Sequence, residues 1–541
     1  MRSKVAIFVA VPVILLICAY VFFRVPFVSK TPYQRVLRYY GTVLISQWKE
    51  SKNYKFAFDP KGQHVKTAKE RLKVPVDELE LPVFFLWIEP IEKKAIDIAY
   101  RDKRKYSLYH EDRMLLQTEE YSMPYVDAVI EFEGKQYDAG VKLRGEGIWH
   151  WIGNPSYRVK LDDKDRILDM GPRINMRRNE YMNIVSFLLH FMLGEDAGLI
   201  TPKTMIGHLF INGEYQGLRT VFEHYDEGFV DRHLPGAELF RETYQQPQEV
   251  LYSYFGEDPN DYPHWNSLTA DRRTNSWQDF ISLLRTVSLD DDETFQKEIG
   301  EHLDIQSFIK FTNLAVIAGA PYLISLDNTW LTNPDDGRLI PVVSDTPGYT
   351  DREGVLTRDI HEFYNPIGFR LFTLMPDIMA EKDDVLREML TNEASVEKMN
   401  QRIDEVVANI DHDVEFSSSD FHNAVSELKS WIERRYVFIT SELDEQTPHV
   451  VSQDGEFILK ARPVEKWRIE GALDTLIEPK ISYYRPDVFE NIDMGSKFDL
   501  AKIELHRNQV RFDEVSIPFP AGEVWITNVR TGEKKHLNAE L

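Results

Sequence analysis

The chain of 541 residues has a single cysteine, Cys18, and contains no internal repeat or low-complexity segment. One cysteine excludes a disulfide within the chain and any zinc or iron–sulfur site built from several cysteines. Basic side chains are also fewer than acidic ones. The chain has 64 lysine and arginine residues and 88 aspartate and glutamate residues, which gives a net charge of −24. A surface this acidic repels a phosphate backbone, so no nucleic-acid partner is expected.

Several common catalytic signatures are also missing. The sequence has no Gly-x-x-x-x-Gly-Lys-Ser/Thr loop for phosphates, no Gly-x-Ser-x-Gly nucleophile turn and no His-x-x-x-His zinc spacing. His150, which lies between Trp149 and Trp151, is therefore interpreted as a packing residue rather than a metal ligand. These absences disfavour the P-loop nucleotide hydrolases, the α/β-hydrolases and the zinc proteases.

The N-terminus carries one long apolar run, from Val5 to Phe23, preceded by Arg2 and Lys4. This length can cross a hydrocarbon core of about 30 Å. No Ala-x-Ala cleavage site ends the run, so residues 1–30 are predicted to form an uncleaved transmembrane signal anchor. The polar residues 31–80 are predicted to form a juxtamembrane stalk. We expect a single-pass membrane protein whose bulk is extracytoplasmic, because long domains after a short anchor translocate largely regardless of charge.

Hydrophobic periodicity predicts an α+β fold. Short or alternating apolar runs bounded by Gly and Pro indicate strands, and apolar residues repeating at i, i+4 and i+8 indicate helices. The first half is predicted to contain strands, one helix around 184–194, and hairpin turns at Glu133-Gly134-Lys135 and Asn212-Gly213. Residues 276–320 and 367–447 are predicted to be mostly helical.

The order of these elements divides the chain into parts. A β-rich N-lobe followed by a helical C-lobe is the two-lobed plan of a protein kinase, and we predict it for residues 81–447. The ordinary kinase strings His-Arg-Asp, Asp-Phe-Gly and Ala-Pro-Glu are absent. From 450 to 541 short alternating runs punctuated by Pro and Gly predict a separate β-rich accessory domain.

Four groups of residues follow one another in a characteristic order. They are Val141-Lys-Leu-Arg-Gly145 with Pro155-Ser-Tyr-Arg-Val-Lys-Leu161, then Leu209-Phe-Ile-Asn-Gly-Glu-Tyr-Gln-Gly-Leu218 with Glu223 and Asp226, then Asp327-Asn328 with Ile340-Pro-Val-Val-Ser-Asp345, and lastly Glu427-Leu-Lys-Ser-Trp-Ile-Glu-Arg-Arg435. Together they resemble the spore coat protein H (CotH) kinase family, an atypical, secreted-kinase-like group. The resemblance covers about residues 82–447.

This resemblance implies an ATP-dependent phosphoryl transfer with Mg²⁺ or Mn²⁺. Asp345 would be the main metal ligand, Asn328 a second ligand, and Asp327 the residue that orients the acceptor hydroxyl. Arg158 or Lys160, which share one face of a strand, would bind the phosphates. Arg144 would begin a loop that covers the phosphates, and Glu223 or Glu180 would pair with the phosphate-binding cation.

Two departures from the family pattern leave alternatives open. The family has Trp-Asp-x-Asp where this chain has Ser344-Asp345-Thr346-Pro347, and Asp327 stands directly beside Asn328 instead of a few residues before it. The leading hypothesis is a kinase that acts on a protein hydroxyl. The alternatives are another ATP-dependent transfer, such as adenylylation or amino-acid ligation, and a pseudokinase scaffold in envelope or surface-polymer assembly. The expected partner is accordingly a protein substrate or an envelope-assembly protein.

Overall fold

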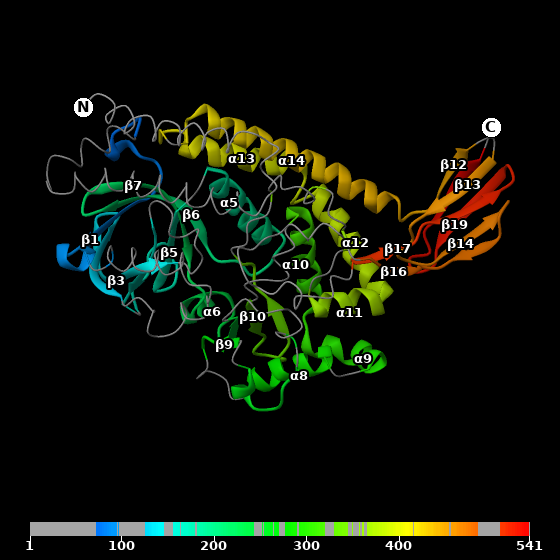
Figure 1. The fold of residues 1–541 in the computed structure, drawn as a ribbon, viewed down its shortest axis with the longest axis horizontal. Helices are drawn as coiled ribbons and strands as arrows, with labels where there is room; N and C mark the ends of the chain where they lie inside the picture. The colour runs from blue at the N-terminus through cyan, green and yellow to red at the C-terminus, as the bar shows by residue number, and fades with distance from the viewer. Residues whose placement is uncertain are drawn as a thin grey trace, which may run out of the picture.

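The computed structural model gives the arrangement of most of the chain after the predicted stalk (Figure 1). It describes residues 72–94, 96, 125–144, 155–162, 164–178, 181–242, 252, 254–262, 265–269, 276–288, 291–319, 329–344, 349, 356, 360–361, 365–414, 416–453, 456–484 and 509–539. The predicted anchor, residues 1–30, and most of the predicted stalk lie outside the described residues.

Seven strands form a closed barrel in the order β1-β2-β3-β4-β5-β7-β6. All neighbours are antiparallel except β1 and β6, which pair in parallel from Val83 opposite His208 to Leu86 opposite Ile211. The bounds are β1 (Val83–Ile88), β2 (Val126–Phe132), β3 (Lys135–Arg144), β4 (Ser156–Leu161), β5 (Arg173–Arg178), β6 (Thr204–Ile211) and β7 (Glu214–Glu223).

Apolar side chains fill the interior of this barrel. Phe84, Ile130, Val159, Met176 and Val221 come from five different strands and are almost completely buried in one cluster. Because successive side chains of a strand point to opposite faces, the residues between these positions lie on the outer surface of the barrel. Polar side chains that could act on a ligand therefore lie outside the barrel rather than within it.

The two predicted hairpin turns are present. Glu133 and Gly134 join β2 to β3 with φ of 50° and 74°, and Asn212 and Gly213 join β6 to β7 with φ of 49° and 80°. Two consecutive residues with positive φ match the two-residue turn whose twist suits a right-handed strand pair. Asn and Gly accept this conformation at low cost, which explains why the sequence signal was reliable here.

Helices pack beside the barrel and extend away from it (Figure 1). The helix α5 (Tyr181–Asp196) follows β5 and shares a hydrophobic core with the long C-terminal helices. The other helices are α6 (Glu227–His233), α8 (Ser276–Ser288), α9 (Asp292–His302), α10 (Ile305–Ala318), α11 (Pro366–Leu374), α12 (Pro376–Thr391), α13 (Val396–Ile410) and α14 (Ser419–Asp444), with 3₁₀ turns at η3 (Val76–Glu78) and η7 (Pro259–Asp261).

A second sheet, in the order β11-β10-β8-β9, combines segments that are far apart in sequence. Its strands are β8 (Leu239–Glu242), β9 (Trp265–Ser267), β10 (Thr329–Thr332) and β11 (Leu339–Pro341). In this sheet Thr329 lies opposite Arg241, so the start of β10 is next to the end of β8.

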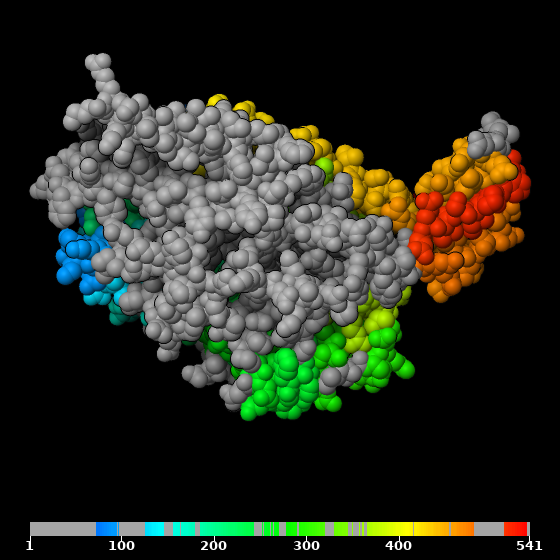
Figure 2. All heavy atoms as spheres, viewed as in Figure 1, coloured from blue at the N-terminus to red at the C-terminus, as the bar shows by residue number. Residues whose placement is uncertain are grey.

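Most of the C-terminal strands form a small body beyond the end of α14 (Figure 1), which projects from the rest of the molecule in the space-filling view (Figure 2). Three strands pair as β12-β13-β18 and four as β15-β14-β19-β20, with β16 and β17 as a separate pair. The bounds are β12 (His449–Gln453), β13 (Glu456–Ala461), β14 (Trp467–Gly471), β15 (Thr475–Ile477), β16 (Ile481–Tyr484), β17 (Gln509–Phe512), β18 (Val515–Phe519), β19 (Gly522–Asn528) and β20 (Lys534–Ala539). Arg530 connects this body to α12, because its guanidinium pairs with Asp384 at 2.7 Å and with Glu465 at 2.6 Å.

The mixed α+β fold is thus confirmed, and within the described residues strands and helices occupy the segments in which they were expected. The two-lobed kinase arrangement and the boundaries of the predicted domains remain predictions. Within the ranges described above, no helix combines the length and the apolar character that crossing a membrane requires. The predicted span, residues 5–23, lies outside those ranges.

Candidate functional site

A row of side chains crosses the outer face of the barrel at one level. The strand registers place Lys142 opposite Arg158, Arg158 opposite Asn175, and Asn175 opposite Phe222. The Nε atom of Arg158 donates a hydrogen bond of 2.9 Å to Oδ1 of Asn175. Arg158 is therefore held on the outer face, as the alternation of β4 predicted, and its neighbours on β3 and β5 are fixed by the same ladder.

Further cations flank this row on both sides. Arg144, at the end of β3, places its guanidinium 4.7 Å from the ring centroid of Phe222. Arg173, at the start of β5, forms an ion pair of 3.1 Å with the buried Asp226. Lys160 lies directly opposite Arg173 in the ladder. In the part of the chain that the structure describes, Lys160 has no ion-pair partner.

The second sheet adds one more arginine. Arg241 of β8 lies with its guanidinium 5.6 Å from the ring centroid of Tyr225. The hydroxyl of Tyr225 donates a hydrogen bond of 2.8 Å to the carbonyl of Val343, which follows β11. The segment 222–226 at the end of the barrel is therefore in contact with side chains from both sheets.

His224 is close enough to four of these cations to respond to their charge. Burial holds the pKa of its imidazole well below the ordinary value, and the positive charges of Arg158, Arg241, Arg173 and Arg144 lower that pKa further. We call these four arginines the arginine cluster. Guanidinium groups bind phosphate oxygens in a two-pronged geometry, so this arrangement suits a polyphosphate ligand.

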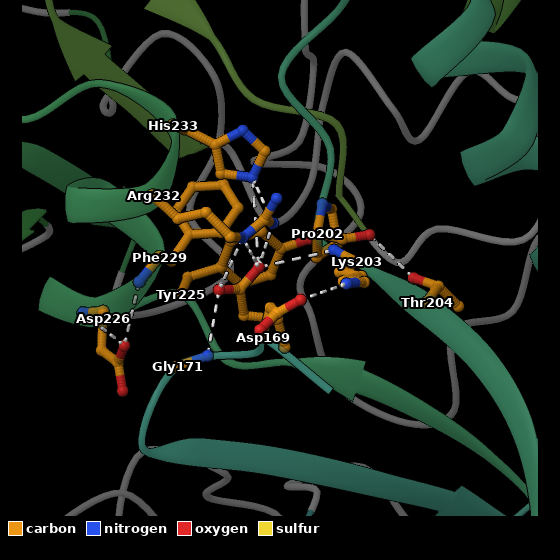
Figure 3. A network of polar contacts seen from close by, with 12 residues as sticks. Asp169, Gly171, Pro202, Lys203, Thr204, Tyr225, Asp226, Phe229, Arg232 and His233 are labelled. Atoms are coloured by element: carbon orange, nitrogen blue, oxygen red, sulfur yellow. Dashed lines mark hydrogen bonds and ion pairs between the residues drawn. The ribbon is translucent and has the colours of Figure 1, made fainter. Parts of the chain in front are cut away.

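Glu223 was predicted to pair with the phosphate-binding cation, and its carboxylate is completely buried. It accepts hydrogen bonds from the backbone N–H groups of Gly171 at 3.2 Å and Lys203 at 3.4 Å. The Nε atom of Arg232 is 3.1 Å from both of its oxygens, and Nη2 of Arg232 is also in contact with it. Among the described residues its ion-pair partner is Arg232, not Lys160 or Arg158 (Figure 3). The imidazole of His233, whose pKa burial lowers to about 4, lies 4.0 Å away.

Asp226 connects the barrel to α6. Its Oδ1 accepts from the backbone N–H of Gly228 at 3.0 Å and of Phe229 at 3.4 Å, which caps the N-terminus of the helix (Figure 3). Burial raises the pKa of Asp226 to about 6, although Arg173 and the two N–H groups act in the opposite direction. The helix cap and the ion pair to Arg173 together fix the segment around which the arginine cluster is arranged.

The predicted metal ligands and the predicted catalytic residue, Asn328, Asp345 and Asp327, lie outside the described residues. Their described chain neighbours are close together. The N–H of Val342 donates a hydrogen bond of 3.0 Å to the carbonyl of Thr329, the residue after Asn328. Carboxylate and amide oxygens carried on such adjoining segments are the donor types that Mg²⁺ and Mn²⁺ prefer. The described residues alone contain no group of three or more His, Cys, Asp or Glu side chains that could hold a metal ion.

Sequence reasoning identified part of this arrangement. Arg144, Arg158 and Lys160 were predicted as ligand-binding residues, and the structure places them on the same outer face; whether they bind a ligand stays a prediction. Arg173, Arg241 and His224 were missed. Arg173 shares the outward position next to Lys160 in the ladder, so strand pairing could have indicated it. Nothing in the local sequence of β8 distinguishes Arg241, because only the pairing of β8 with β10 brings it to the site.

Comparisons with known proteins agree with the order of motifs. The family described as "CotH kinase protein" matches residues 142–439 of this chain. A search of curated proteins finds no match. Among solved structures, the complex of HipA, HipB and operator DNA from the Shewanella oneidensis MR-1 toxin–antitoxin system matches with 12% identity, over 60% of this chain and 67% of that one, at a TM-score of 0.27. A TM-score this low does not establish a shared fold.

Proposed function

Because the chain belongs to the CotH kinase protein family, we propose that it is an atypical kinase that transfers the γ-phosphate of ATP to a hydroxyl group of a protein. In the reaction the acceptor oxygen attacks the γ-phosphorus, the bond to the β,γ-bridging oxygen breaks, and ADP leaves. The hydroxyl proton would pass to the carboxylate of Asp327. The kinase-like character follows from the family, whereas the acceptor and the transfer itself are proposals.

The observation that carries the proposal is the position of the arginine cluster at the end of the barrel. Phosphoryl transfer is mainly a matter of positioning the phosphates and neutralising their charge. Arg144, Arg158 and Arg173 approach from the barrel and Arg241 from the second sheet, around residues 222–226. These groups would bind the α- and β-phosphates. The γ-phosphate would then point toward the segments next to Thr329 and Val342.

A divalent cation would be held by Asp345 and Asn328, and it would supply charge neutralisation between the β- and γ-phosphates. The two segments that carry these ligands are brought together by the pairing of β10 with β11 and by the hydrogen bond from the N–H of Val342 to the carbonyl of Thr329. The hydroxyl of Tyr225 helps to position the segment after β11 through its hydrogen bond to the carbonyl of Val343. The described contacts therefore support an oxygen-ligand site beside the arginine cluster.

A thermal-shift titration with ATP and Mn²⁺ tests this function. At 100 times Kd, bound ligand stabilises the folded state by about 2.7 kcal/mol. Wild type should show the shift and Asp345→Ala should not, whereas Asp335→Ala, in the exposed turn between β10 and β11, should behave as wild type. Transfer of label from γ-labelled but not α-labelled ATP to a protein acceptor would separate phosphorylation from adenylylation.

A second candidate function is a pseudokinase scaffold in envelope or surface-polymer assembly. The sequence Ser344-Asp345-Thr346-Pro347 favours it, because it lacks the second carboxylate of the family pattern. A scaffold predicts no phosphoryl transfer and full biological function of Asp345→Ala in cells. Retention of ATP binding without transfer would support the scaffold over the kinase.

We also propose that residues 5–23 anchor the protein in a membrane, with the remainder outside the cytoplasm. The support is the uninterrupted apolar run after Arg2 and Lys4. Full-length protein should stay in the membrane fraction at alkaline pH, and a variant starting at residue 31 should be released. Protease added outside intact cells should digest the chain, and protection of the chain would contradict the proposed orientation.

A further inference from the structure

Four side chains outside the proposed nucleotide site connect the barrel to the turn between α13 and α14. They are His208 on β6, Tyr215 on β7, and His412 and Asp413 in the turn, and we call them the histidine clasp. We propose that the histidine clasp is sensitive to protons, and that protonation of its histidines releases the turn and the residues bound to it from the barrel. The inference does not depend on the proposed function, because it involves neither a nucleotide nor a metal.

The histidine clasp is a continuous chain of hydrogen bonds. Nε2 of His412 lies 2.8 Å from Nε2 of His208, and Nδ1 of His208 lies 2.8 Å from the hydroxyl oxygen of Tyr215. That hydroxyl donates a hydrogen bond of 2.5 Å to Oδ2 of Asp413. His208, Tyr215 and Asp413 are buried, so a donor or acceptor that loses its partner in the closed clasp remains unsatisfied.

The direction of each bond assigns the protons of the clasp. A carboxylate only accepts hydrogen bonds, so the hydroxyl proton of Tyr215 points to Asp413, and the hydroxyl oxygen accepts from Nδ1 of His208. A neutral imidazole carries one N–H proton, so Nε2 of His208 is an acceptor and the proton between the two rings belongs to His412. Every donor of the chain therefore meets an acceptor while both rings are uncharged.

The closed clasp accommodates one additional proton but not two. A proton on Nδ1 of His412 leaves the three bonds of the chain intact. A further proton on Nε2 of His208 would place two N–H groups against each other across 2.8 Å and two positive charges at a buried site. Burial and the charge of His412 lower the pKa of His208 to about 3. The residues opposite His208 in the barrel, Val83 and Leu218, are uncharged and offer no compensation.

The charged groups around His412 are Lys73, Glu80, Asp411, Asp413 and His422. The three carboxylates act to raise the pKa of the His412 imidazole, but burial has the larger effect and lowers this pKa overall. Lys73 pairs with Asp411 at 3.3 Å, and His422 lies 3.5 Å from the same carboxylate. An open state with both rings in water therefore binds protons more readily than the closed state, so a fall in pH favours opening.

Opening would release the residues that are attached to the turn. The N–H of Lys73 donates a hydrogen bond of 2.8 Å to the carbonyl of His412, and Leu72 forms a β-bridge with Asp413. Leu72 also packs in a small hydrophobic cluster with two side chains of the β6–β7 hairpin. Residues 72–79 precede β1 in the chain, so their release would lengthen the connection to the barrel by up to about 25 Å. The clasp thus controls how closely the barrel is held to the chain that precedes it.

Hydrogen–deuterium exchange of the full-length protein at pH 7.5 and pH 5.5 tests the clasp, with EDTA present so that no metal ion bridges the two rings. After correction for the intrinsic effect of pH on amide exchange, protection of residues 72–79 should fall by about tenfold through His208 alone, and by up to about 100-fold if His412 contributes fully. Low urea should not change this protection, because local opening exposes little surface, whereas protection of the β2–β3 hairpin should fall through global unfolding.

A variant assigns the effect to the pair of histidines. In His412→Gln the amide can turn its oxygen toward a protonated His208, so the closed clasp accepts the proton and the pH dependence should shrink to less than about threefold. His422→Gln, which removes a histidine beside the clasp but outside its chain of bonds, should keep the wild-type dependence. The unfolding midpoint of each variant at pH 7.5 shows whether it is folded, and the measurements on wild type need no variant.

Three results would overturn the inference. They are a protection of residues 72–79 that does not change with pH, a protection that falls with urea in parallel with the β2–β3 hairpin, and a pH dependence in folded His412→Gln equal to that of wild type. None of them bears on the nucleotide site, so the proposed function is tested separately.

Discussion

The hydroxyl of Tyr225, just after the last barrel strand, donates a 2.8 Å hydrogen bond to the carbonyl of Val343. Both residues are buried, and Val343 is two positions before Asp345. This single bond connects the segment surrounded by the arginine cluster with the segment that carries the predicted metal ligand. The two halves of the proposed site are therefore coupled by a contact that mutation can remove.

Tyr225→Phe should weaken this coupling. The variant leaves the buried carbonyl of Val343 without its donor, which costs about 1–2 kcal/mol of folding stability. If the bond positions the metal site, the Mn²⁺ concentration needed for the ATP-dependent thermal shift should also rise several-fold. Tyr254→Phe, which removes an exposed hydroxyl bonded to Glu257, is the matched control. An unchanged Mn²⁺ requirement in Tyr225→Phe would limit this bond to a structural role.

Glu223→Gln should destabilise the fold strongly. Removal of one partner from a buried ion pair leaves the other charge uncompensated, and we expect a loss of about 3 kcal/mol. The Arg232 side chain is 32% exposed, so water offsets part of the cost. Urea denaturation measures the loss. Glu227→Gln, on the exposed first turn of α6, should change stability by less than about 0.5 kcal/mol; equal effects of the two variants would contradict the assigned partner.

Folding stability should fall with acidification. Burial lowers the pKa of His190 and His208 to about 3 and that of His233 to about 4, with His412 and Arg232 adding to the effect for the latter two. Below pH 6.5 these histidines are protonated in the unfolded chain but stay neutral in the folded protein. Folding stability is therefore lost as pH falls. Asp226, with a pKa of about 6, acts in the opposite direction because the folded state takes up a proton first.

Between pH 7.5 and pH 5.5 these three histidines and Asp226 together should lower stability by about 3 kcal/mol, counting about 1.4 kcal/mol for each histidine less about 1 kcal/mol for Asp226. His224, whose pKa burial and the neighbouring arginines also lower, should add to this loss. Denaturation with urea at three pH values measures it. His190→Leu should reduce this loss by about 1.4 kcal/mol, because it removes one of the groups that cause it. A stability that stays level down to pH 5.5 would mean that these histidines are protonated in the folded protein.

Arg435→Met should be more harmful than Arg434→Met. The guanidinium of Arg435 is buried and donates to the carbonyl of Val316 at 2.8 Å and to that of Leu356 at 2.8 Å. The substitution removes the hydrogen bonds of the guanidinium to these two carbonyls, for which we expect about 3 kcal/mol. Arg434 is exposed on the same helix, so its replacement should cost little. Similar unfolding midpoints for the two variants would contradict the anchoring role of Arg435.

Sequence patterns predicted turns and helices well where these elements depend on residues that are close together in the chain. The turn at Asn212-Gly213 and the periodic helix that begins near Ile184 depend on residues a few positions apart, and both were found. The closed barrel was not predicted. It depends on the parallel pairing of Val83–Leu86 with His208–Ile211, and alternation along a strand does not specify its partner.

The same limit applies to the candidate site. Arg158 and Lys160 could be assigned to one strand face from alternation alone. Arg241 could not, because its proximity arises from two short strands that pair across a separation of almost ninety residues. Glu223 was recognised as a functional candidate, yet its partner Arg232 depends on the turn after β7 and the short helix α6 that Asp226 caps.

The most direct test of the proposed site is a crystal structure with a non-hydrolysable ATP analogue and Mn²⁺, using the anomalous signal of the metal. The account predicts a manganese peak bound by oxygens of Asp345 and Asn328, with the α- and β-phosphates against Arg158 and Arg241. A nucleotide bound elsewhere, or side chains of Asp345 and Asn328 that point away from each other with no metal between them, would contradict it.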